Sequence, residues 1–323
     1  RLPARVAVRR TRRRAGVREF TDEFVSSAPV QEMMTRVTNV FDQQIEAQGF
    51  EKLGIDVGPL TSPRRFIGAD LVHAHGLKAG WLGIPIAWMY RVPLIVTWHN
   101  AVLGEGIAPA AARQTLRAVA MGADLTLGAS RDLVALATRL GARNVRLSPV
   151  AAPILPPAKT SRAEQRRSLG AGPEDTVTAT VTRLAPQKNL SMVLDIAAAL
   201  RDRPDLRFVV AGDGPEHQKL QRRIADERLQ VALLGRSDDV ASLLGAADLA
   251  LLTSTWEARA LVAQEALLAG VPLISTRVGG IEDLVDSAAV LVSPGDVDEA
   301  ARQIMALADD PSERHRLSEA GRR

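Results

Sequence analysis

Cysteine is absent from the 323 residues of this sequence, so neither a disulfide framework nor a cysteine-ligated zinc site can form. A chain without disulfides suits a reducing compartment, and we expect a cytoplasmic protein. Long apolar runs are also missing. The stretch 81–90 is shorter than the roughly 20 residues that a membrane-spanning helix needs, and it contains Pro85. The N-terminus lacks the apolar segment of a signal peptide.

The charges nearly balance, with 41 basic against 37 acidic side chains and a net charge of +4. The composition therefore gives no general case for nucleic-acid binding. However, seven arginines lie within residues 1–14. We interpret this run as a solvated chain end. The alternative is a patch that contacts acidic lipid headgroups, at the inner face of the plasma membrane, or nucleic acid.

Short apolar runs alternate with helical patterns from residue 70 onward, which is typical of a parallel sheet covered on both faces. Prolines 149, 153, 156 and 157 interrupt the alternation, because proline at this density continues neither a helix nor a central strand. Before the interruption, the predicted strands are residues 71–74, 94–97 and 125–127, and the predicted helices are 78–90, 109–121 and 131–140.

The alternation then restarts, and two Rossmann-like, doubly wound α/β domains are predicted, facing a cleft at the carboxyl ends of their sheets. The first domain covers residues 1–150, a linker 151–175 and the second domain 176–323. The helix after residue 189 buries one face, and Asp296 caps a final helix that ends at Ala308. The predicted strands are 176–182, 207–211, 231–234, 249–252, 273–276 and 290–292.

Two glutamates lie eight residues apart in WEARALVAQEALL, residues 256–268. Glu257 is predicted to follow strand 249–252. Glu265 is predicted to lie about two turns inside the next helix, on nearly the same face. Such a pair can accept hydrogen bonds from two hydroxyl groups of one extended ligand. The alternative is a pair of solvated glutamates on a surface helix.

Two further segments have the character of phosphate-binding turns. In TRLAPQKN, Arg183 ends a buried strand and Lys188 precedes a helix, so both cations can meet a diphosphate. In VGGIE, the backbone N–H groups of Gly279 and Gly280 can approach a phosphate closely. The alternatives are a capped loop with exposed charges and a purely geometric glycine turn.

Three histidines lie near the ends of two predicted strands in the first domain. We interpret His73 as a buried strand residue with a satisfied ring. His99 directly follows its strand, and we assign it a function as hydrogen-bond donor or base. No metal site is expected, because the histidines lack ligand spacing on one helix. Asp296 and Asp298 are interpreted as the cap of a late helix.

Together these segments resemble glycosyltransferase family 4 (group 1), the large retaining family with the GT-B fold, and its actinobacterial members in particular. The motifs follow the family's order and spacing over about residues 68–321. The resemblance implies a hexosyltransferase-like enzyme that moves a sugar from a UDP- or GDP-type nucleotide sugar to a lipid, polymer or small-molecule acceptor, without metal or added cofactor. The motifs are DLVHAHG, VTWHN, TRLAPQKN, FVVAGDGPE, WEARALVAQEALLAGVPLISTRVGG and AAVLVSPGD.

The resemblance also assigns individual residues. Glu257 matches the glutamate that contacts the transferred sugar, and Glu265 the one that contacts the ribose. Arg183 and Lys188 match the pair that offsets the charge of the leaving diphosphate. His99 matches a histidine near the reacting sugar.

Gly235 and Arg236 lie where the family's backbone contacts the base. Two departures from the family pattern stand out: residues 258–261 are Ala-Arg-Ala-Leu where Gly-Phe-Gly-Leu is common, and residues 1–66 show neither an opening strand nor a glycine-rich loop. We therefore expect an atypical or truncated N-terminal part. The alternatives are a degenerate nucleotide-sugar binder without turnover and a GT-B nucleotide-sugar epimerase.

Overall fold

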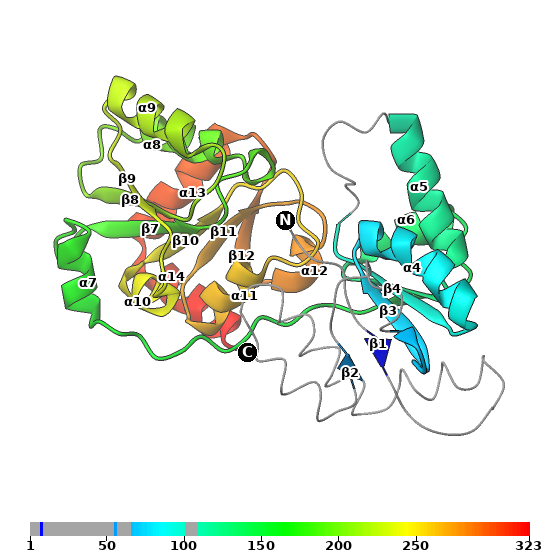
Figure 1. Cartoon of the computed structure of the whole chain (residues 1–323). Helices are drawn as coiled ribbons and strands as arrows, with labels where there is room; N and C mark the ends of the chain where they lie inside the picture. The colour runs from blue at the N-terminus through cyan, green and yellow to red at the C-terminus, as the bar shows by residue number, and fades with distance from the viewer. Residues whose placement is uncertain (1–6, 9–54, 57–65, 101–108) are drawn as a thin grey trace. The chain divides into compact units, whose positions relative to one another are not determined.

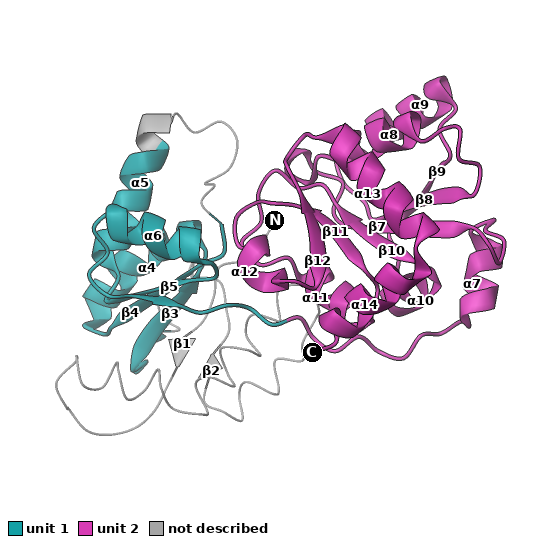
Figure 2. Cartoon of the chain, turned by 180° about the vertical axis from the view of Figure 1, so that it is seen from behind, with its two compact units in different colours: residues 1–151 teal, residues 152–323 magenta. Residues whose placement is uncertain are grey.

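A computed structural model describes residues 7–8, 55–56, 66–100 and 109–323. The chain divides into two compact units, residues 1–151 and 152–323 (Figure 2). Residues 20–48, whose sequence also predicts a helix, lie outside the described residues. The arginines of residues 1–14 also lie outside the described residues. Ala7 and Val8, which stand among these arginines, are described and form strand β1.

The first unit contains a six-stranded sheet in the order β2-β1-β3-β4-β5-β6. Strands β3 to β6 pair in parallel, whereas β1 and β2 extend the edge in antiparallel fashion. The three predicted strands are confirmed, each extended by one residue. The two-residue strands are too short to show an apolar pattern in the sequence. The strands are β1 (Ala7–Val8), β2 (Ile55–Asp56), β3 (Leu71–His75), β4 (Leu94–Trp98), β5 (Leu125–Gly128) and β6 (Val145–Leu147).

Three helices connect the parallel strands of this unit: α4 (Leu77–Tyr90), α5 (Pro109–Gly122) and α6 (Arg131–Arg139). Because β3 to β6 follow one another in both sequence and space, right-handed crossovers place all three helices on the same face of the sheet. They lie side by side in Figure 1. The ends of all three predicted helices agree with the structure to within one residue.

The second unit is a doubly wound sheet of six parallel strands in the order β12-β11-β10-β7-β8-β9. The chain builds outward from β7 to β9, then returns to place β10 against the other edge of β7. The pair β7 and β10 is therefore the topological switch point, where folds of this kind bind ligands. Its strands are β7 (Thr176–Val181), β8 (Leu206–Ala211), β9 (Val231–Gly235), β10 (Leu249–Leu252), β11 (Leu273–Thr276) and β12 (Ala289–Val292).

Two apolar clusters cover the two faces of this sheet, and β10 contributes to both. Leu249 and Leu251 belong to the cluster under α8, α9 and α13, whereas Ala250 and Leu252 belong to that under α10, α11 and α12. This alternation is the period of two expected for a strand. The helices are α8 (Leu190–Ala199), α9 (His217–Glu227), α10 (Val240–Ala246), α11 (Leu261–Leu268), α12 (Ile281–Val285), α13 (Val297–Asp309) and α14 (Pro311–Gly321).

Two predicted helix features are confirmed. The face of α8 predicted to be buried, including Leu190 and Val193, is at most 5% exposed. Asp296 caps α13 by accepting a hydrogen bond from the backbone of Glu299 at 2.9 Å. The prediction that this helix is the last one was wrong, because α14 follows it with Asp310 as its N-cap, and the polar residues of α14 show no apolar pattern.

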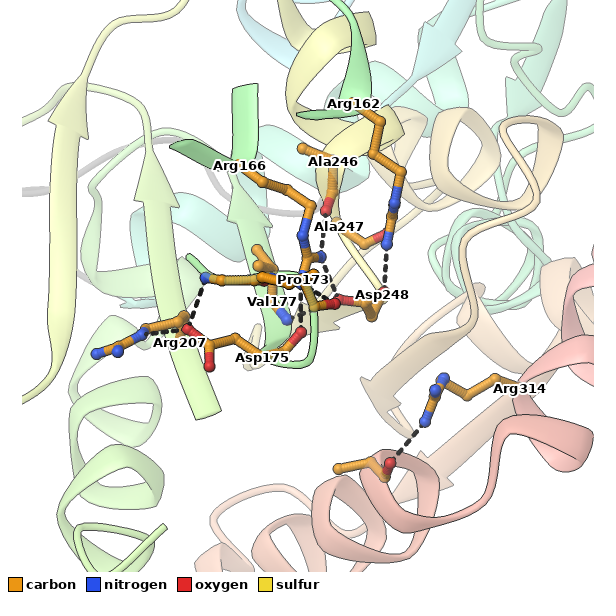
Figure 3. Close-up of polar contacts among 12 residues, drawn as sticks. Arg162, Arg166, Pro173, Asp175, Val177, Arg207, Ala246, Ala247, Asp248 and Arg314 are labelled. Carbon is orange, nitrogen blue, oxygen red and sulfur yellow. Dashed lines mark hydrogen bonds and ion pairs between the residues drawn. The ribbon is translucent and has the colours of Figure 1, made fainter. Parts of the chain in front are cut away.

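The range predicted as a linker contains a short helix, α7 (Arg162–Ser168), which packs on α10 of the second unit. A capping box between Ser161 and Glu164 starts it. Arg166 is 6% exposed and donates hydrogen bonds to Asp248 and to surrounding carbonyl groups (Figure 3). Because this helix binds through arginine and not through an apolar face, the hydrophobic pattern did not reveal it.

Candidate active site

Two of the predicted site residues, Lys188 and Glu257, meet at the switch point of the second unit. Lys188 follows β7 in the single 3₁₀ turn Pro186–Lys188, and Glu257 follows β10. Hydrogen bonds tie the two loops together: the Thr255 backbone N–H donates to the carbonyl of Gln187 at 2.8 Å, and the Thr253 hydroxyl to that of Lys188 at 3.0 Å. Two segments about 70 residues apart in sequence thus form one surface.

Lys188 and Glu257 form a largely buried ion pair. The Lys188 Nζ lies 2.5 Å from Oε1 of Glu257, and the Ser254 hydroxyl donates to the same oxygen at 2.6 Å. Glu257 is 7% exposed. Its Oε2 accepts no hydrogen bond from the residues that the structure describes. One carboxylate oxygen therefore anchors the lysine while the other remains available to a ligand.

The glycine pair holds the Glu257 loop in place. Gly279 has φ +53°, and a Cβ atom there would lie 1.9 Å from the carbonyl oxygen of Glu257. The backbone N–H of Gly280 donates to that same oxygen at 2.8 Å. The glycine turn therefore packs closely against the backbone of Glu257 and holds it in place. The backbone N–H of Gly280 is already used in this hydrogen bond. Contact between Gly279 and a phosphate stays a prediction.

A second glycine turn connects Gly235 to the loop that bears Arg183. In the FVVAGDGPE segment, a Cβ on Gly212 would lie 1.7 Å from the carbonyl oxygen of Thr182, and the Gly212 N–H donates to the Gly235 carbonyl at 2.7 Å. The glycines of this segment therefore form a tight turn after β8. Arg236 extends away from it, with a side chain 84% exposed and 3.5 Å from Asp238.

Arg183 and Glu265 lie on either side of the ion pair in the sequence. The Arg183 side chain is exposed and has no ion-pair partner among the described residues. The half-buried Glu265 is the fifth residue of α11, little more than one turn inside the helix. The prediction of two turns was wrong, because α11 begins only at Leu261, after the N-cap Ala260.

Two further residues of the Glu257 loop, Ser254 and Arg259, were not predicted from the sequence. Ser254 has no motif of its own and is recognisable only by its contact with Glu257. The Nε of Arg259 is buried without a hydrogen-bond partner among the described residues. Burial lowers the pKa of its guanidinium, and the charge of Asp283 opposes this shift. The only sequence signal for Arg259 was its place in the unusual Ala-Arg-Ala stretch.

The first unit brings its three histidines together. Nδ1 of His75 lies 3.1 Å from Nε2 of His99, and Nε2 of His73 lies 2.7 Å from the Thr97 hydroxyl. The interpretation of His73 as buried with a satisfied ring is confirmed. Burial lowers the pKa of His73 to about 3 and that of His99 to about 4, and the pKa of His75 is lowered for the same reason. All three imidazoles are therefore neutral at pH 7.

Among the described residues, no group of three or more histidine, aspartate and glutamate side chains could hold a metal ion. No helix in the described ranges is both long and apolar enough to cross a membrane.

The fold and the position of the ion pair define the class of protein. A structure of Anabaena Alr3699/HepE in complex with UDP-glucose matches with TM-score 0.71 and 24% identity, over 80% of this chain and 74% of that one. A sucrose-phosphate synthase from Thermosynechococcus elongatus matches with TM-score 0.69 and 22% identity, over 79% and 68%. The two α/β units are those of the GT-B fold, although among the described residues only the second unit shows the predicted double winding.

Sequence comparison names the family. Residues 161–323 match the model described as glycosyl transferases group 1, and residues 4–153 match the model described as glycosyl transferase 4-like domain. The chain belongs to the group 1 glycosyltransferases and is a glycosyltransferase. Because the second match begins at residue 4, it includes most of the stretch 1–66 in which the family's opening motifs are not apparent.

Among curated relatives, the alpha-D-kanosaminyltransferase of Streptomyces kanamyceticus is 30% identical over 281 residues, covering 79% of this chain and 72% of the relative. The 2-deoxystreptamine glucosyltransferase of the same organism is 29% identical over 279 residues, covering 77% and 70%.

Proposed function

We propose that this glycosyltransferase moves a hexosyl group from a nucleoside-diphosphate sugar to a hydroxyl acceptor with retention of the anomeric configuration. The observation that carries the proposal is the Lys188–Glu257 ion pair at the switch point. It offers a cation for a diphosphate and a carboxylate oxygen for a sugar hydroxyl within one constellation. The solved relative with UDP-glucose supports the same class of donor.

The charges suit a donor of this kind. The Lys188 ammonium has three N–H donors, and Glu257 accepts one of them, which leaves two for phosphate oxygens. The exposed guanidinium of Arg183 supplies a second cation, with a planar fork that matches phosphate. Both cations stabilise the charge that builds on the diphosphate as the glycosidic bond breaks.

The remaining roles follow from the family match. Glu265 binds the ribose, the backbone at Gly235 and Arg236 contacts the base, and His99 hydrogen-bonds the reacting sugar. Because its pKa is lowered to about 4, His99 acts as a neutral hydrogen-bonding group at pH 7 and not as a cation.

Retention is expected through attack from the face that the diphosphate leaves. The acceptor oxygen forms its bond to the anomeric carbon as the bond to the phosphate oxygen breaks. The hydroxyl proton passes to the departing diphosphate. Neither a metal nor a cofactor beyond the donor takes part in this scheme.

The acceptor is a lipid, a polymer or a small molecule. Relatives carry names such as 2-deoxystreptamine glucosyltransferase and D-inositol 3-phosphate glycosyltransferase, so small polyols are the first acceptors to screen. The arginine run within residues 1–14 could also contact acidic lipid. Because Ala7–Val8 forms β1, the arginines should be replaced by serine without deleting the segment. Unchanged vesicle binding would remove this role.

The donor site is tested by thermal unfolding with a panel of nucleotide sugars and free nucleotides. A ligand at 100 times its Kd stabilises by about 2.7 kcal/mol, a rise in Tm of about 5–10 °C for a unit of this size. Arg183→Ala is the sharpest variant, because this exposed side chain has no described partner to lose. Arg302→Ala removes an equally exposed arginine from α13 and is the matched control.

A shift that is lost in Arg183→Ala and in Glu265→Ala, but kept in Arg302→Ala, supports the site and identifies the base. A shift unchanged in both site variants contradicts it. Product analysis then separates the alternatives, because an epimerase changes the nucleotide sugar itself and a degenerate binder yields no product.

A further inference from the structure

Helix α4 of the first unit presents an apolar outer face. The apolar side chains of this outer face recur at intervals of three or four residues, so they form one stripe along the helix. On the opposite side, Ala79 and Ile86 are buried against the sheet. The stripe consists of Trp81, Leu82, Pro85, Trp88 and Met89, and the exposed fractions are 50% for Trp81, 44% for Leu82, 83% for Trp88 and 60% for Met89.

This arrangement is unusual for a helix that faces water. A surface helix normally carries polar residues opposite its buried stripe, whereas α4 is apolar on both sides. Two of the four tryptophans in the chain lie in the stripe. A contiguous apolar surface of this kind marks a site of interaction.

The charged side chains that α4 and α5 carry are all positive. Neither α4 nor its neighbour α5 contains an aspartate or glutamate. The two helices pack together, since a Cβ on Gly122 would lie 2.8 Å from Ile84. Exposed cations flank the stripe: Lys78 and Arg91 at the ends of α4, and Arg113 and Arg117 on α5.

We propose that the outer face of α4 lies flat in the interface of a membrane that contains anionic lipid. Tryptophan prefers the headgroup level, where its ring is apolar and its N–H is solvated. The helix is 14 residues long, about 21 Å, which is too short to cross a core of about 30 Å but suits an interfacial helix. The surrounding cations match acidic headgroups.

A second copy of this chain fits the stripe less well. Pairing two α4 helices would bring the flanking cations of both copies together without an acidic partner on either α4 or α5. The proposal goes beyond sugar transfer and does not depend on the donor site.

Co-sedimentation of the full chain with vesicles tests the proposal. Vesicles of phosphatidylcholine with about one third phosphatidylglycerol should bind the protein, and pure phosphatidylcholine should bind it less. Trp88→Glu should lower binding to the anionic vesicles about tenfold or more, because it places a charge in the interface. Ile154→Glu, at a position 91% exposed in the second unit, is the matched control and should bind like the unaltered chain.

Intrinsic fluorescence provides an independent measurement, because insertion of Trp81 and Trp88 should shift the emission to shorter wavelength. Absence of vesicle binding by the unaltered chain overturns the proposal. Equal binding by Trp88→Glu, with loss when the arginines of residues 1–14 become serine, also overturns it and assigns binding to that run. A concentration-dependent dimer that Trp88→Glu abolishes, without vesicle binding, assigns the stripe to a second copy.

Discussion

Arg166→Ala should destabilise the second unit more than any change at its exposed arginines. The side chain is 6% exposed and donates to Oδ2 of Asp248 at 2.7 Å and to the carbonyl groups of Ala246 at 3.1 Å and Gly172 at 2.8 Å. It also donates to the carbonyl of Asp175. These acceptors belong to two segments of the chain, residues 172–175 and 246–248, and Figure 3 shows Asp175, Ala246 and Asp248 around the Arg166 side chain.

The expected loss is about 4 kcal/mol. Removing one partner of a buried ion pair costs about 3–5 kcal/mol, because the remaining charge is left uncompensated. Here Asp248 keeps two other contacts, the side chain of Arg162 and the backbone N–H of Val177 at 2.8 Å, which lowers the loss. The carbonyl groups that lose their donor raise it again, by about 1 kcal/mol or more if water does not reach them.

Arg162→Ala is the matched control, on the same helix and against the same carboxylate. Its side chain is 49% exposed, so the loss should stay below about 1 kcal/mol. Urea unfolding, followed by circular dichroism with and without a donor nucleotide that binds the second unit, measures both. A loss for Arg166→Ala no larger than that for Arg162→Ala would refute the reasoning, because burial would then add nothing to the pair.

Three further predictions concern the sites. Gly279→Ala should lower stability by about 2 kcal/mol or more and weaken donor binding, since its Cβ would lie 1.9 Å from the Glu257 carbonyl at φ +53°; calorimetry and nucleotide titration measure the two effects. Glu257→Gln should leave free nucleoside diphosphate binding equal or tighter while turnover falls about 100-fold or more, because it frees Lys188 and removes a negative charge near the phosphates; titration and steady-state rates test this. Stability should decline as the pH falls from about 6.5 toward 4. In the folded chain the pKa of His73 is about 3 and that of His99 is about 4, both below the unfolded value, so the unfolded chain binds protons first. Unfolding at pH 7, 6 and 5 measures the decline.

Each of these has a control within the chain. Gly245→Ala meets open space at a position without positive φ and should be neutral or stabilising. Tighter nucleotide binding in Glu257→Gln should disappear when Lys188→Met is added. His73→Asn should flatten the pH dependence. Stability that stays constant from pH 7 to pH 5 would contradict the assignment of neutral, buried imidazoles.

Most of the parallel strands could be predicted because they are short apolar runs bounded by turn residues. The parallel strand β6 was missed, because Arg146 interrupts its three residues and none of them is fully buried. Strands 249–252 and 273–276 have the predicted ends in the structure. The missed elements lack that signal. Strands β1 and β2 have two residues each, and α7 binds through Arg166 and not through an apolar face. The antiparallel edge of the first sheet therefore had to come from the structure.

The site was predictable as separate residues but not as a constellation. The alternation of strands and helices places Lys188 after one strand and Glu257 after another, yet it does not say that those strands are neighbours. Only the strand order, with β10 beside β7, brings the ammonium and the carboxylate within 2.5 Å. The roles of Ser254 and Arg259 depend on contact and burial, which no local pattern of sequence encodes.

The ion pair also explains how such a site can exist before its ligand arrives. A buried lysine or glutamate alone would be strongly destabilising, since each charge would lose its hydration. Paired, and with Ser254 as a further donor, the two charges compensate each other while the loops on either side hold their positions. In the proposed function, a diphosphate adds to a lysine that is already oriented, so less reorganisation is needed when charge develops on the leaving group. The same arrangement means that changes at Lys188 alter folding and donor binding together, which is why the exposed Arg183 gives the cleaner test of binding.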